Sequence, residues 1–136
     1  MNINNDYAEN HTFDELRIGQ SARLLRTLTP QDIQAFAAVS GDTNPAHLDA
    51  EYANETLFHG VIAHGMWSGA LISALLGTQF PGTGTIYLDQ ALHFARPVRI
   101  GDTLTVSVTV AAKDEHKKVV ELACEAVNQK GERVVS

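Results

Sequence analysis

The sequence predicts a single α+β domain in which an antiparallel sheet packs against one buried helix. The stretch 61–76 is apolar on nearly all sides, as expected of a helix enclosed by protein. After residue 82 the period of the apolar residues changes to two, which is typical of strands. Short turns separate these strands, so neighbouring strands should run antiparallel. The predicted class is therefore α+β.

The first half of the domain should contain short elements around a constrained loop. Residues 20–28 predict a strand, and Thr29 is placed to cap a helix that ends near Gly41. Pro45 then keeps the preceding residue out of the helical region, so the chain here should form a tight, irregular loop. Asp49 is placed to cap one further helical turn.

The second half should contain the long helix and a meander of strands. The alternation of apolar and polar residues predicts strands over 85–94, 103–113, 119–129 and 132–136. The last of these ends without a turn or polar tail. We therefore expect that the natural chain continues beyond this point.

Composition excludes several classes of protein. The chain has 136 residues, 44% of them hydrophobic, and a formal net charge of −6, which fits one folded domain and disfavours nucleic acid as a partner. The longest apolar stretch is too short for a membrane span of roughly 20 residues. A single cysteine forms no internal disulfide, and residues 1–12 do not resemble a secretory signal, so a cytoplasmic location is expected. Those residues should form a flexible tail before a domain spanning 13–136.

An acid, an amide and an imidazole lie within six residues of the constrained loop. These are Asp42, Asn44 and His47. A carboxylate beside an imidazole can hold a water molecule and move its protons, with the amide orienting the bound molecule. The alternative is structural: Asp42 and Asn44 form turn hydrogen bonds only, and His47 is a satisfied structural histidine. The spacing alone leaves both interpretations open.

The segment 59–66 opens the predicted long helix and contains two glycines. The free N–H groups of a first helical turn, aided by the helix dipole, can receive a developing negative charge, which would make this an oxyanion hole. The alternative is that Gly60 and Gly65 serve only turn geometry and packing.

Two other kinds of site are disfavoured. A zinc site could use His47, His59 and His64, but the last two are five residues apart instead of four and no cysteine pair supports them. Ser68 and Ser73 lack the surroundings of a nucleophilic serine and are expected to bond to helix carbonyls.

Three motifs in order resemble one known family. The segment 36–53, with SGDTNPAH at 40–47, resembles the hydratase 2 motif of MaoC-like, (R)-specific enoyl-CoA hydratases. AHGM at 63–66 resembles the start of their long helix, and PGTGTIYL from residue 81 resembles the strands that follow. The resemblance covers nearly everything from residue 13 to residue 136.

The resemblance implies a hot-dog fold, in which an antiparallel sheet wraps one long helix, usually in a homodimer with sites near the subunit interface. It implies that Asp42 and His47 are the catalytic pair and that the Gly65 N–H is the oxyanion donor. The chain departs from the family at Ala46, where Leu or Ile is usual, and at the end of the last strand. Positions that contact substrate are expected at Asn44, His64, Met66 and Ser73.

The activity that the resemblance implies is reversible addition of water to a trans-2-enoyl-CoA, giving the (R)-3-hydroxyacyl-CoA. Only protons move, so neither a metal nor a redox cofactor is expected. Arg96 and Arg99 are candidates for contacts with the CoA phosphates, although solvated surface arginines are the simpler interpretation. Two alternatives remain: a non-catalytic hot-dog module of a larger enzyme, and a hot-dog thioesterase, which should carry an acid on the central helix. The stretch 61–76 has no Asp or Glu.

Overall fold

The computed structural model describes residues 9–136. The prediction of a flexible tail over residues 1–12 therefore falls mostly outside the described residues. At its end, the Glu9 N–H donates to the Thr78 carbonyl (2.7 Å) and the His11 N–H to the Pro81 carbonyl (2.6 Å). Residues 9–11 thus pack with the folded body of the chain.

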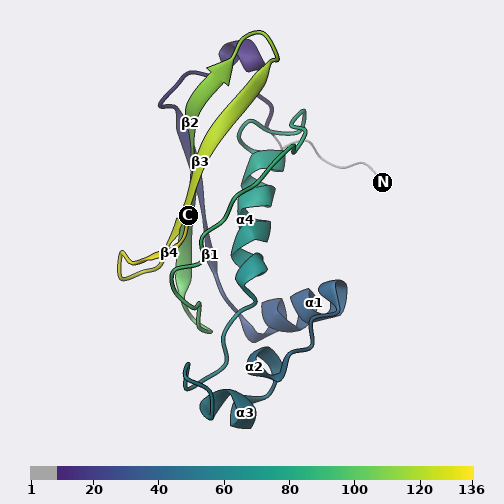
Figure 1. Ribbon diagram of the computed structural model, residues 1–136, viewed down its shortest axis with the longest axis vertical. Coiled ribbons are helices and arrows are strands. Elements are labelled where there is room, and N and C mark those ends of the chain that lie inside the picture. The colour runs from purple at the N-terminus through teal and green to yellow at the C-terminus, as the bar shows by residue number, and fades with distance from the viewer. Residues whose placement is uncertain (1–8) are drawn as a thin grey trace.

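Four antiparallel strands form one sheet in the order β1-β2-β3-β4, shown in Figure 1. They agree with four of the five predicted strands. The alternation along β2 places four apolar side chains on the face toward the core, each at most 1% exposed: Leu104, Val106, Val108 and Val110. The strands are β1 (Ser21–Thr27), β2 (Thr103–Asp114), β3 (Val119–Val127) and β4 (Arg133–Val135).

Helix α1 (Pro30–Ser40) begins where the sequence predicts. The Thr29 hydroxyl accepts the Asp32 N–H, and the Asp32 carboxylate accepts the Thr29 N–H, which is a capping box. Burial raises the pKa of Asp32, but hydrogen bonds from Arg26 (2.7 Å) and Thr29 outweigh it and hold that pKa below its usual value. Gly41 ends the helix with φ 77°, a left-handed conformation that glycine adopts without strain.

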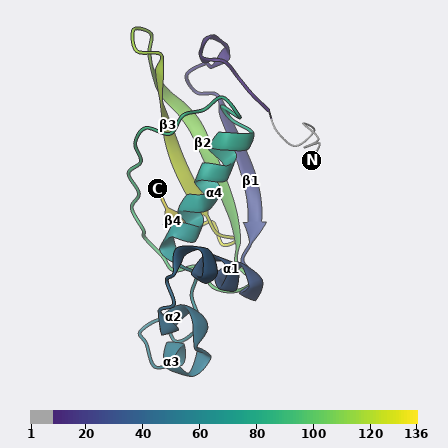
Figure 2. The same cartoon turned by 90° about the vertical axis from the view of Figure 1, so that its right-hand side faces the viewer.

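Two short helices follow, so the expectation of an irregular loop through His47 is wrong from Pro45 onward, where proline occupies the first position of a helical turn. Asn44 caps α2 (Pro45–Leu48), and Asp49 caps α3 (Ala50–Asn54) as predicted, accepting two backbone N–H groups. In Figures 1 and 2 these helices and α1 gather at the end of the sheet where α4 begins.

Helix α4 (Gly65–Thr78) begins four residues later than the stretch 61–76 suggests. The reason is pairing with a distant segment: Ile62 forms a bridge with Arg99, and the Ala63 N–H donates to the Val98 carbonyl (2.8 Å). No helix in residues 9–136 is long and apolar enough to cross a membrane.

The sheet covers only one side of α4, as Figure 2 shows, so the expectation of a helix enclosed all round is wrong for the single chain. The face toward the sheet is buried and includes Trp67, Ile72, Leu75 and Leu76. The opposite face is exposed and mostly small, and includes Met66, Ala70, Ser73 and Ala74.

The predicted strand over 85–94 is not formed within the chain. The segment is extended but makes only one bridge, from Phe94 to Val135 in β4. The physical reason is the lack of a neighbour, since residues 86–92 make no backbone-to-backbone hydrogen bond with any described residue. The side chains of Ile86 and Leu88 are consequently 81% and 65% exposed.

Candidate active site

Asp42 follows the left-handed turn at Gly41, which directs the chain away from α1 and back toward α4. One oxygen of its carboxylate, Oδ1, accepts the Asn44 N–H (3.2 Å), and Asn44 Oδ1 accepts the Ala46 N–H (3.0 Å). These are the bonds that the turn interpretation requires. The second oxygen, Oδ2, has no partner among the described residues, so the turn leaves it available for chemistry.

His47 has a defined orientation. Its Nδ1 lies 2.7 Å from the Ile62 carbonyl oxygen. A carbonyl only accepts, so Nδ1 carries the hydrogen of the neutral ring and Nε2 keeps its lone pair. The Ile62 N–H in turn donates to the Ala46 carbonyl (3.4 Å). This backbone bond anchors α2. It does not depend on the size of the side chain at Ala46, where the family usually has Leu or Ile.

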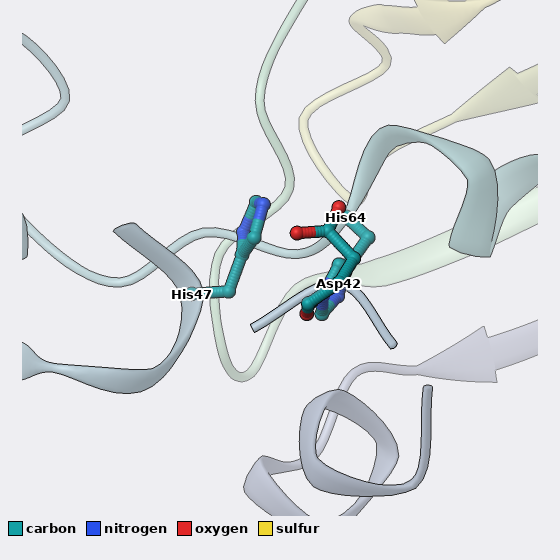
Figure 3. Close-up of side chains that lie close together, drawn as sticks. All are labelled: Asp42, His47 and His64. Carbon is teal, nitrogen blue, oxygen red and sulfur yellow. The ribbon is translucent and has the colours of Figure 1, made fainter. Parts of the chain in front are cut away.

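The loop and the start of α4 bring three side chains together: Asp42, His47 and His64. One ligand atom from each lies within 4.8 Å of the other two. Figure 3 shows the Asp42 carboxylate pointing toward the His47 ring. The His47 and His64 rings stack with centroids 4.0 Å apart and planes 28° apart. An acid and a base thus face one small volume.

The cluster differs from the zinc site that the sequence analysis considered and disfavoured. His59 is exposed and does not belong to the group, whose third member is the Asp42 carboxylate. A nitrogen lone pair lies in the plane of its ring, so two nearly parallel stacked rings aim poorly at one ion. A water molecule, whose hydrogen bonds tolerate wider angles, fits this geometry better.

A cavity of about 280 Å³ is lined by His47 and His64, whereas Asp42 does not line it. Gly65 lies on its wall as the first residue of the 14-residue helix α4, and its N–H has no acceptor among the described residues. The ring of Phe94 would lie 3.2 Å from a Cβ at this position. A free N–H at a helix start is a donor for a developing oxyanion. The other lining residues include His47, His64, Ser68, Phe58, Ile62, Val98 and Val134.

The remaining predicted site residues are placed differently. Asn44 is exposed and caps α2, while Met66 and Ser73 lie on the uncovered face of α4 and do not line the cavity. Neither Ser68 nor Ser73 makes the expected bond to a helix carbonyl among the described residues. Ser68 instead lines the cavity while its side chain is buried. Its spacing of three from Gly65, which puts both on one helix face, is the signal that could have found it.

Arg96 and Arg99 are both exposed and already have partners. Arg96 forms an ion pair with Glu132 (3.1 Å), and the Arg99 guanidinium donates to the Phe58 carbonyl. Both line a smaller surface hollow, and Arg96 also lines the cavity beside His47. The contacts of Arg99 agree with the surface interpretation, whereas Arg96 is placed to contact a molecule in the cavity.

The chain is also similar to known proteins in sequence and in structure. Residues 15–130 match the MaoC like domain family. The chain belongs to the MaoC-like family. It is 52% identical to an (R)-specific enoyl-CoA hydratase of Rhodospirillum rubrum over 110 residues, which are 81% of this chain and 76% of that protein. It is 44% identical to the (R)-specific enoyl-CoA hydratase of Aeromonas caviae, over 89% of this chain and 90% of that one.

Solved structures give the same family and its fold. The unliganded R-hydratase PhaJ1 from Pseudomonas aeruginosa superimposes with a TM-score of 0.88 at 52% identity, over 93% of this chain and 81% of that one. This MaoC-like chain therefore has the predicted α+β hot-dog fold. The departures at Ala46 and at the last strand do not change the fold.

Proposed function

We propose that this MaoC-like protein is an (R)-specific enoyl-CoA hydratase, which adds water reversibly to a trans-2-enoyl-CoA to give the (R)-3-hydroxyacyl-CoA. The observation that carries the proposal is that the Asp42 carboxylate lies close to His47, which lines the same cavity as the free Gly65 N–H. The two relatives named as (R)-specific enoyl-CoA hydratases support it.

The catalytic pair holds the reacting water between Asp42 Oδ2 and His47 Nε2. His47 Nε2 carries the lone pair, because Nδ1 donates to the Ile62 carbonyl, so it can take one proton as the water oxygen bonds to C3 of the substrate. The Asp42 carboxylate accepts a hydrogen bond from the hydrogen that the new C3 hydroxyl keeps, and its charge stabilises the imidazolium. The one proton taken up by the pair is then delivered to C2, which converts the enolate to the saturated thioester and restores the pair.

The Gly65 N–H polarises the thioester carbonyl in this mechanism. Negative charge develops on that oxygen as the substrate takes on enolate character, and the dipole of α4 favours charge at its start. Ser68, one turn farther along, is placed to contact the bound acyl group. The steps use proton transfers only, so we propose that no metal or redox cofactor takes part.

Two alternatives fit the site less well. A hot-dog thioesterase should carry an acid on its central helix, but α4 has the sequence GMWSGALISALLGT, without Asp or Glu. A non-catalytic module would have no use for Asp42 and His47 converging beside a cavity. Incubation with crotonyl-CoA separates all three: a hydratase removes the enoyl absorbance and releases no free thiol, a thioesterase releases thiol, and a binding module does neither.

We further propose that the protein is a homodimer in the cytoplasm. The extended segment 86–92 offers unpaired backbone and the exposed side chains of Ile86 and Leu88, and the uncovered face of α4 is apolar and mostly small. Unpaired strand backbone and contiguous apolar surface both favour a partner chain. Pairing of two such segments would cover both features at once. A single cysteine suits a reducing compartment.

Light scattering should report twice the mass of one chain at micromolar concentration. Replacing both Ile86 and Leu88 with lysine should shift the protein to monomer, because two charges would be buried without partners at the interface. The matched control is the double replacement of Ile18 and Leu25 with lysine, which should leave the mass unchanged because both are exposed apolar residues at the β1 edge of the sheet, far from β4 and the segment 86–92. A wild-type protein that is monomeric under these conditions would contradict the dimer.

A further inference from the structure

His64 is one of two polar side chains that are buried among residues 9–136, with 3% of its surface exposed. It precedes α4 as its N-cap residue, yet its side chain makes no capping bond. Its Nε2 instead lies 2.9 Å from the backbone carbonyl oxygen of Asp42, 22 residues earlier in the chain. Because a carbonyl only accepts, Nε2 carries the hydrogen and Nδ1 has the lone pair.

The ring of His64 lies between two helices. On one side it stacks on His47 of α2, with centroids 4.0 Å apart, and on the other it lies beside Phe36 of α1, with centroids 5.0 Å apart. His47 is itself bonded to the carbonyl of Ile62, two residues before His64. The segment 62–64 therefore holds Asp42 through its backbone and His47 through its ring.

A histidine at position 64 lowers the stability of the fold relative to an apolar ring, which indicates a role for its side chain beyond packing. His64 Nδ1 is buried with no hydrogen-bond partner among the described residues. An unsatisfied buried polar atom lowers the stability of the fold, whereas a phenylalanine would fill the same space without such an atom. The imidazole offers one thing that phenylalanine lacks, which is the Nε2–H donated to Asp42.

We propose that His64 is a positioning residue, which sets the separation of the Asp42 carboxylate and His47 Nε2 through its hydrogen bond to the Asp42 carbonyl and its stacking on the His47 ring. It acts through these two residues and transfers no proton itself. The inference rests on the proposed hydratase activity. Errors of about 1 Å in the placement of reacting groups lower turnover by about 100-fold, so the effect should be measurable.

Two variants separate the hydrogen bond from the packing. His64→Phe keeps a ring for stacking but removes the donor, and should lower kcat for crotonyl-CoA by about 100-fold with KM within about two-fold. His64→Gln keeps an N–H near the position of Nε2 and should recover at least about ten-fold of that loss. A His64→Phe enzyme with wild-type kcat would overturn the proposal, as would a loss confined to KM, which would make His64 a substrate contact.

A double variant tests whether His64 acts through the pair. In an Asp42→Asn background, His64→Phe should lower the residual kcat by less than about two-fold, because residues acting as one unit are not additive. A full further loss of about 100-fold would show an independent role and overturn the proposal.

A readout without substrate separates this inference from the proposed function. Nitrogen-15 spectra of the wild-type protein should show hydrogen on Nε2 of His64 and on Nδ1 of His47. The His47 signals should shift more in His64→Gln, which lacks the stacking ring, than in His64→Phe, which keeps it. Hydrogen on Nδ1 of His64 would overturn the positioning bond even if hydration is observed. The expected spectra from a protein without hydratase activity would instead refute the proposed function alone.

Discussion

Asp42→Asn and His47→Ala should each lower kcat for enoyl-CoA hydration by roughly 10²–10⁴-fold while leaving the fold intact. Asparagine keeps an oxygen for the Asn44 N–H but has no negative charge to stabilise the imidazolium. Alanine removes the base and its bond to the Ile62 carbonyl, which costs about 1 kcal/mol of stability. Steady-state kinetics and thermal unfolding on the same samples measure both effects.

Matched controls exist for both substitutions. Asp49 caps α3 through two backbone N–H groups, and Asp49→Asn should leave activity unchanged because asparagine caps equally well. His59 is exposed, lies outside the cluster and has φ 54°, which asparagine tolerates, so His59→Asn should also be active. Near wild-type turnover in either catalytic variant would contradict the two-residue mechanism, and an Asp42→Asn protein that fails to fold would favour the turn-only interpretation.

Gly65→Val should lower kcat/KM for enoyl-CoA by about 100-fold or more, a much larger effect than its effect on stability. A Cβ at this position would lie 3.2 Å from the Phe94 ring, so a branched side chain must take space beside the free N–H or displace the ring that lines the cavity. In either case the thioester oxygen loses access to its donor. The measurement is kcat/KM together with the midpoint of thermal unfolding.

Substitutions at two other glycines serve as controls for Gly65→Val. A Cβ on Gly77, near the end of the same helix, would meet nothing within 4 Å, so Gly77→Val should leave kcat/KM unchanged. A Cβ on Gly60 would lie 3.2 Å from the Arg99 guanidinium, and Gly60→Ala should therefore act mainly on stability by disturbing the contact of Arg99 with Phe58. A folded Gly65→Val protein with ordinary hydration kinetics would mean that the carbonyl is polarised from elsewhere.

Most of the fold could be predicted from local patterns in the sequence. The alternation in β2 predicted its buried face because the period of a strand is fixed, and Thr29 with Asp32 marked the start of α1 through a bond of short range. The segment 85–94 was predicted as a strand from the same alternation, but a strand also needs a neighbour, and residues 86–92 have none among the described residues. The uncovered face of α4 was missed for the same reason.

The site was predictable where its residues are close in sequence and not where they are distant. Asp42 and His47 are only five residues apart, on the two sides of the α2 cap, so their spacing indicated a joint function. The bond from His64 to Asp42 spans 22 residues and depends on how α1, α2 and the start of α4 pack, which no local pattern records. Ser73 was expected in the cavity but lies on the uncovered face of α4, while Ser68 lines the cavity.

Chiral analysis of the product formed from crotonyl-CoA tests the central claim most directly. A water held by Asp42 and His47 can approach only one face of the double bond while the carbonyl is fixed at Gly65. We expect (R)-3-hydroxybutyryl-CoA as the sole enantiomer, formed by the wild-type protein and lost in Asp42→Asn. Formation of the (S) enantiomer, of a racemate, or of the same product by the Asp42→Asn variant at an undiminished rate would contradict the proposed function and its catalytic pair.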